Sequence, residues 1–175
     1  QLLVFTRRMN LEEDFYTAMQ NEDGSWAPAT PLGPPVSTTT FREGSISISP
    51  DGKTLFFAAD YQLGGRSNWD IFYSEMGENG WGKPKNVGDK INSAHFESQP
   101  SISSDGKELY FVSKRPGGFG GMDIWVSRLQ DDCTWSEPVN LGENINTSKD
   151  EQVPFIHPDG QTLYFGSEGR TGMGG

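Results

Sequence analysis

Three glutamates at a fixed spacing are the residues of this chain best placed to do chemistry together. Glu43, Glu97 and Glu151 follow one another at steps of 54 residues. Residues that repeat in this way occupy the same place in successive structural units, where three carboxylates would form an acidic ring for a cation or a basic peptide. The structural alternative is that each carboxylate accepts hydrogen bonds from the backbone of its own unit or from an arginine such as Arg115.

A second set of side chains has the chemistry of protein recognition. Aromatic, thioether and guanidinium groups lie in or beside glycine-rich loops, where binding residues concentrate. The candidate partner-binding residues are Arg66, Trp69, Arg115, Phe119 and Met122. Because aromatic and arginine side chains carry much of the binding free energy at protein interfaces, we predict a partner-binding surface formed by these loops.

Aspartates and asparagines at repeated positions have a structural interpretation. Asp70 and Asp123 each follow a glycine-rich segment, and we expect their carboxylates to hold that segment by accepting backbone N–H groups. Calcium binding by these aspartates is the alternative. Asn92 and Asn146, in the repeated dipeptide Ile-Asn, are expected to cap a turn between two units.

The residues of common catalytic sites are not arranged as catalysis requires. The sequence contains no Gly-x-Ser-x-Gly, and its two histidines, His95 and His157, stand in unlike contexts that suggest neither a triad nor a zinc site. Residues 132–135 match a sialidase-type Asp-box only in part, and such a box is itself a structural turn. We therefore predict no catalytic residue, no metal site and no cofactor.

The elements that must position these residues are strands of a repeated unit. The dipeptide Asp-Gly recurs at 51–52, 105–106 and 159–160, again at steps of 54 residues. An isoleucine stands three residues before each dipeptide, and a leucine with an aromatic pair follows it. Asp-Gly between apolar stretches is typical of a tight hairpin, so each copy predicts two antiparallel strands, A and B.

Two further strands complete each unit. Strand C is predicted from the apolar stretches that begin at Asp70 and Asp123, and strand D from the stretches that begin at Trp81 and Trp135. Strand D contains a proline, which is tolerated in an outermost strand because that strand need not donate every hydrogen bond.

Four antiparallel strands per repeat of about 50 residues are typical of a β-propeller blade. We therefore predict an all-β fold, a partial β-propeller with four-stranded blades and a repeat step of 54 residues. A β-sandwich is the alternative, but sandwich strands do not repeat their side-chain chemistry at a fixed step. The expected boundaries are strands B to D at 1–42, full blades at 43–96 and 97–150, and strands A and B at 151–175.

This organisation has two consequences. If strand A is innermost, the three glutamates lie at the mouth of the central channel. Because closed propellers have about four to eight blades and both ends fall within a blade, we expect the chain to be part of a longer polypeptide.

The repeat resembles that of a known family. Together, residues 49–57, their copies from Ser103 and His157, and residues 115–124 resemble TolB-like (WD-like) propeller repeats. The form of residues 115–124 is similar to repeats in OmpA-family cell-envelope proteins of the Bacteroidetes. The resemblance implies a location in the periplasm or at the outer membrane, beside helical repeats and a peptidoglycan-binding domain. Some proteins of this kind belong to type IX secretion and gliding machinery.

Composition limits the partners. A formal net charge of -10 argues against nucleic acid, because phosphate binding needs clustered lysine and arginine. No apolar stretch approaches the ~18 residues that span a bilayer, so we expect no direct membrane insertion. The leading hypothesis is a non-catalytic module that binds another protein of the cell envelope. The alternative is an accessory propeller of a hydrolase, which gates a peptidase or presents a carbohydrate-binding face.

Overall fold

The computed structural model of the chain describes residues 1–9, 12–38, 41–61 and 68–172. The regular elements that we name below are all strands. Within the same ranges, the structure contains no helix long and apolar enough to cross a membrane. The strands form separate antiparallel sheets, called blades 1 to 4 here in chain order.

The blades contain between two and five strands each. Blade 1 consists of β1 (Leu2–Met9), β2 (Glu12–Met19) and β3 (Thr30–Pro31). Blade 2 consists of β4 (Arg42–Ile48), β5 (Thr54–Asp60), β6 (Asp70–Gly77), β7 (Gly80–Trp81) and β8 (Lys85–Asn86). Blade 3 consists of β9 (Glu97–Ile102), β10 (Glu108–Ser113), β11 (Asp123–Arg128) and β12 (Val139–Asn140). Blade 4 consists of β13 (Glu151–Ile156) and β14 (Leu163–Ser167).

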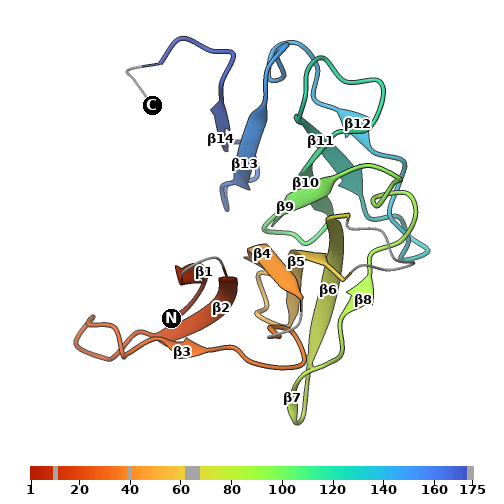
Figure 1. Ribbon diagram of the computed structural model, residues 1–175. Coiled ribbons are helices and arrows are strands. Elements are labelled where there is room, and N and C mark those ends of the chain that lie inside the picture. Colours follow the sequence, from red (N-terminus) through yellow and green to blue (C-terminus); the bar gives the residue numbers. More distant parts are fainter. Residues whose placement is uncertain (10–11, 39–40, 62–67, 173–175) are drawn as a thin grey trace.

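The strand order agrees with the sequence. In blade 3 the strands pair as β9-β10-β11-β12, which is the order A to D. In blade 2 the outermost strand is divided into β7 and β8, which both pair with β6. The sheets fan out from a common centre, with β4, β9 and β13 nearest to it (Figure 1). The prediction of an all-β, partial β-propeller is therefore confirmed, and strand A is innermost.

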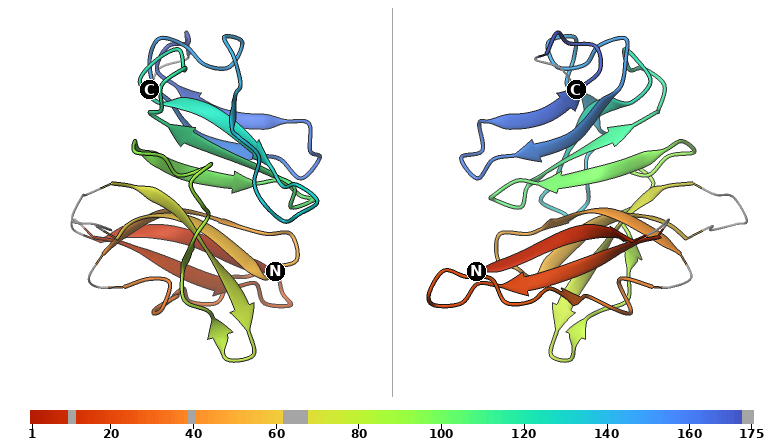
Figure 2. Two further views of the ribbon diagram at one scale, coloured as in Figure 1. Left: turned by 90° about the vertical axis from the view of Figure 1, so that its right-hand side faces the viewer. Right: turned by 60° about the vertical axis from the view of Figure 1, so that its left-hand side comes forward.

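Each Asp-Gly dipeptide forms the predicted hairpin turn. In blade 3 the turn joins Ile102 to Leu109, which are paired residues of β9 and β10. The Asp105 carboxylate accepts hydrogen bonds from the Ser103 hydroxyl (2.6 Å) and from the Lys107 amide (3.0 Å). Gly106 adopts a φ of 71°, in the left-handed region that glycine tolerates. These turns lie on one side of the stacked blades (Figure 2).

The innermost strands contain a β-bulge that the sequence pattern did not predict. Ser45, Gln99 and Val153 stand at the same repeat position and have φ values of 50°, 55° and 46°. The register of strand A against strand B shifts at this position in all three blades. An extra residue of this kind bends the strand and turns its side chains, so residues before and after the bulge face differently.

The hydrophobic core lies between blades. Phe15 of blade 1 packs with Phe57 and Phe72 of blade 2, and Phe56 of blade 2 packs with Ile102 and Trp125 of blade 3. The innermost strands are also joined directly, because the Ser47 hydroxyl accepts a hydrogen bond from the Ile102 amide at 3.2 Å. The same bond recurs one blade on, from the Ile156 amide to the Ser101 hydroxyl at 3.1 Å. Neighbouring blades therefore stabilise one another.

The hairpin turns provide a test of this fold. Gly106→Val should lower the free energy of unfolding by about 1 kcal/mol or more, because a β-branched residue is strained at positive φ. Lys107→Ala should change it by less than about 0.5 kcal/mol, since that side chain is exposed. Chemical denaturation of both variants measures the difference, and equal effects would contradict the turn geometry.

Candidate functional site

The three repeated glutamates are fully buried, so they do not form an acidic ring open to solvent. The centre of the arc, near the A strands, instead contains a small hollow of about 370 Å³. Its lining is mostly apolar with a few serines and includes Val4, Ile46, Pro100, Pro154 and Phe155. A ligand in that hollow would meet mostly apolar side chains, not the predicted carboxylates.

In blades 3 and 4 the glutamates have a full set of hydrogen-bond donors. Glu97 accepts from the Ser93 amide (2.7 Å), the Ser93 hydroxyl (2.7 Å) and the Ser113 hydroxyl (2.6 Å). Glu151 accepts from the amide and hydroxyl of Thr147, both at 2.7 Å, and from the Ser167 hydroxyl at 2.6 Å. Both carboxylates therefore accept hydrogen bonds from their own blade, which is the structural alternative given above. Each carboxylate holds the loop that enters its blade.

Arg115 reinforces this arrangement, in contrast to its expected role as an exposed binding residue. Its guanidinium lies 3.3 Å from Glu97 Oε1, and its side chain is only 12% exposed. It also donates to the backbone carbonyls of Lys90 and Ile91 and lies over the rings of Phe111 and Trp125. Truncating Arg115 would remove the ion pair with Glu97 and leave these two carbonyls without the guanidinium donor, so the side chain contributes to the fold.

Blade 2 departs from this pattern around Glu43. The position of Ser113 is held by Ala59, and the position of Arg115 is held by Tyr61. Among the described residues, Glu43 Oε1 accepts one hydrogen bond, from the Thr38 hydroxyl at 2.9 Å, while Oε2 and the Tyr61 hydroxyl are buried without a partner. Burial raises the pKa of Glu43 to about 7, against the opposing effect of Thr38.

Asp123 holds its glycine-rich loop as expected, whereas the repeated asparagines bond the backbone of the third strand of their blade. The Asp123 carboxylate accepts hydrogen bonds from the backbone N–H groups of Phe119 and Gly120. Asn146 bonds both the amide (2.8 Å) and the carbonyl (3.0 Å) of Ile124, and Asn92 does the same for its blade. Asp70 accepts from the Asn68 side chain at 3.3 Å. In the described part of the chain, no group of three or more histidine, cysteine, aspartate or glutamate residues is arranged to hold a metal ion.

The remaining predicted binding residues lie on the loop side of the blades, opposite the hairpin turns. Phe119 is 50% exposed, whereas Trp69 and Met122 are half-buried. The Trp69 ring packs close to β4, since a Cβ at Gly44 would lie 3.4 Å from it. Arg66 falls outside the described residues.

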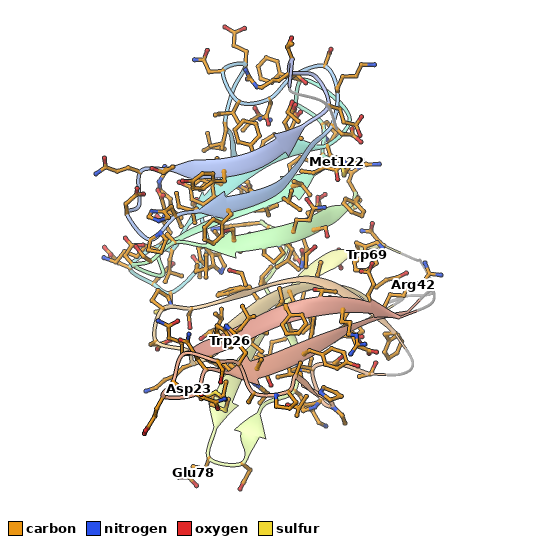
Figure 3. All side chains as sticks on the ribbon, turned by 90° about the vertical axis from the view of Figure 1, so that its left-hand side faces the viewer. Asp23, Trp26, Arg42, Trp69, Glu78 and Met122 are labelled. Carbon is orange, nitrogen blue, oxygen red and sulfur yellow. The ribbon has the colours of Figure 1, made fainter. Side chains whose placement is uncertain are left out.

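Two residues that the sequence reasoning missed belong to the same side. Arg42 lies on the side of the molecule that carries Trp69 and Met122, away from Trp26 and Asp23 (Figure 3). Phe41 is 38% exposed and meets Tyr61 edge to face, with ring centroids 5.1 Å apart. Phe41 and Arg42 are the two residues before the repeated Glu43. The 54-residue repeat therefore predicts their position but not their side-chain types. The loop face is defined here as Phe41, Arg42, Trp69, Phe119 and Met122.

Comparisons with known proteins bear on the fold. No family model matches the chain, and no curated protein matches it. Among solved structures it is similar to a putative TolB from Agrobacterium tumefaciens, with a TM-score of 0.58 and 18% identity over 94% of this chain and 53% of that one. It is also similar to the periplasmic gluconolactonase PpgL of Pseudomonas aeruginosa, with a TM-score of 0.51 and 18% identity over 94% and 46% of the two chains.

A puromycin hydrolase is similar as well, with a TM-score of 0.53 and 19% identity over 94% of this chain and 25% of that one. The chain thus spans about half the length of the TolB and gluconolactonase structures, and a smaller part of the hydrolase. These likenesses agree with the strand order in assigning the chain to the β-propellers.

The incomplete partnering of Glu43 generates a pH prediction. Its pKa is about 7 in the folded chain and near 4.5 when unfolded, so the folded state binds the proton more tightly. The contribution of Glu43 to stability therefore falls as the pH rises from about 4.5 to about 7 and is level above that. Glu43→Gln should remove this slope and raise the free energy of unfolding at pH 8 by about 1 kcal/mol or more.

Denaturant unfolding of the two proteins at pH 5 and pH 8 measures this difference. Glu78→Gln, at an exposed hairpin tip, removes the same charge and is the matched control. If the Glu43 and Glu78 variants show the same pH dependence as the parent, Glu43 does not titrate as the structure indicates.

Proposed function

We propose that this chain is a non-catalytic propeller module that binds another protein of the bacterial cell envelope through its loop face. The observation that supports the proposal is the exposure of Phe119, Phe41 and Arg42, with Phe119 in a loop whose backbone is held by the Asp123 carboxylate. Aromatic and arginine side chains held on an ordered base lose little conformational entropy on binding, which favours affinity.

The cell-envelope setting rests on resemblance. The repeat is similar to TolB-like repeats of envelope proteins, and the similar gluconolactonase is described as periplasmic. A periplasmic or outer-membrane-associated protein of the OmpA family, serving type IX secretion or gliding, is the specific form of the proposal.

Enzymes are among the similar propellers, so an accessory propeller of a hydrolase is the second candidate. In that case the loop face would border a catalytic domain of the same polypeptide or a carbohydrate. The two candidates differ in a measurable way, because loop-face substitutions would then change hydrolysis and not protein capture.

The proposal is tested with Arg42→Ala combined with Phe119→Ala in the full-length protein. Both side chains are exposed, so the variant should unfold at the same denaturant concentration as the parent. Capture of an envelope partner, identified by mass spectrometry and then purified, should weaken by about tenfold or more.

The control is Lys53→Ala combined with Lys107→Ala, beside the Asp-Gly turns on the other side of the blades. This variant should bind the purified partner as the parent does. Loss of binding in the lysine variant, with full binding in the Arg42 and Phe119 variant, would place the interface on the turn side and overturn the proposal.

A further inference from the structure

A groove lies between blades 2 and 3, at the end that carries the Asp-Gly turns. It has a volume of about 820 Å³, which is in the range of ligand sites. Turn residues of both blades, Asp51 and Asp105, line one end of it, and the C–D turn of blade 3 lines another part through Thr134 and Trp135. The groove therefore lies away from the loop face.

Aromatic rings form much of the groove. Phe56 is the central ring, with Trp135 edge to face at 6.2 Å between centroids and Tyr73 at 6.3 Å. All three line the groove, while Phe56 also belongs to the core between the two blades. Because aromatic faces carry a negative quadrupole, a hollow of this kind attracts cations that have an apolar stem.

Carboxylates outnumber cations around the same groove. Four carboxylates line it, contributed by Asp51, Glu75, Asp89 and Asp105. Lys90 is the lysine among the lining residues, and the charge of Lys90 is partly offset because it lies close enough to Asp132 to lower the pKa of that carboxyl.

In two of these carboxylates, hydrogen bonds within the turn favour the ionised form. The Ser49 hydroxyl and the Lys53 amide lower the pKa of Asp51, and the Ser103 hydroxyl and the Lys107 amide do the same for Asp105. In each aspartate these bonds are made to Oδ1. The groove is thus negative at neutral pH.

Two residues that line the groove, Tyr73 and Glu75, already contact a lysine of the protein itself. The Lys85 ammonium lies 2.6 Å from Glu75 Oε2 and 5.5 Å from the centroid of the Tyr73 ring. The Lys85 and Glu75 side chains are each 58% exposed, so an external cation can replace the lysine at little cost. The Glu75 carboxylate and the face of the Tyr73 ring together can therefore contact an ammonium or a guanidinium, one by charge and the other by a cation–π interaction.

We infer that the groove between blades 2 and 3 binds an organic cation, an ammonium or guanidinium group on an aliphatic stem, with Glu75 as its carboxylate and Tyr73, Phe56 and Trp135 as its aromatic walls. Two sources carry this chemistry, a basic peptide segment and a free amine, and the test below distinguishes them. The site is separate from the loop face, so it stands whether or not the proposed function does.

The test is calorimetric titration of the full-length protein with a peptide, acetyl-Gly-Arg-Gly-amide, and with agmatine. The same peptide with citrulline in place of arginine removes the charge and keeps the shape. The arginine peptide or agmatine should bind, the citrulline peptide should bind at least about threefold more weakly, and high salt should weaken the binding of the cations. Tighter binding of the peptide identifies a protein segment as the source, and tighter binding of agmatine identifies a free amine.

Paired variants locate the site. Glu75→Gln should weaken binding of the cation by about threefold or more, whereas Glu78→Gln, three residues along the same hairpin, should leave it unchanged. Lys85→Gln should strengthen binding, because it removes the competing internal ammonium. All three residues are exposed, so the variants should fold as the parent does.

Three results would overturn the inference: equal binding of the arginine and citrulline peptides, no change with Glu75→Gln, or weaker binding with Lys85→Gln. Binding of a neutral disaccharide such as cellobiose in place of the cations would identify the groove as a carbohydrate site instead.

Discussion

A buried carboxylate at the start of each innermost strand is the constraint on which the loop face depends. A glutamate that is removed from water must be paired or bonded by several donors, and a hydrogen bond to a charged group contributes about 1.5–3 kcal/mol. Glu97 and Glu151 obtain their donors from the entering loop and from the end of strand B. Each carboxylate therefore joins two segments far apart in sequence and holds the backbone from which the loop side chains project.

Blade 2 shows what happens when the donors are lost. With Ala59 and Tyr61 in place of the serine and arginine of blade 3, Glu43 accepts one side-chain hydrogen bond from the described residues and has a raised pKa. The same replacement allows aromatic packing, since Tyr61 contacts both Phe41 and Phe72 edge to face. The exposed part of this cluster belongs to the loop face. Among the described residues, the glutamate of blade 2 therefore has fewer donors than those of blades 3 and 4, and aromatic contacts stand beside it instead. Stability and binding often make opposing demands on one position.

The architecture was predictable because the repeat is visible in residue types. Asp-Gly turns and leucine-led aromatic pairs have strong local conformational preferences, so the hairpins and the strand order followed from them, whereas the innermost position of strand A was only a condition of the prediction. The bulge did not, because Ser45, Gln99 and Val153 are not residues that favour positive φ. The full burial of the three glutamates did not follow either, because their spacing fixes a shared place in the repeat and not the exposure of the side chains. The groove between blades 2 and 3 combines residues of two repeats, such as Tyr73 and Trp135, and no local pattern marks such a combination.

The donor that all three glutamates share identifies which contact the fold requires. Arg115 pairs with Glu97, but Arg170 of blade 4 donates to the carbonyls of Asn144 and Ile145, so the ion pair is not general. In blades 2, 3 and 4 the hydroxyl of Thr38, Ser93 or Thr147 donates to the glutamate and also accepts a bond from an amide of the entering loop. A serine or threonine four or five residues before the glutamate is therefore the minimal anchor. This hydrogen bond joins residues that are only four or five positions apart, so it places no requirement on the other residues of the loop. Each blade can therefore present different loop side chains above the same buried hydrogen bond.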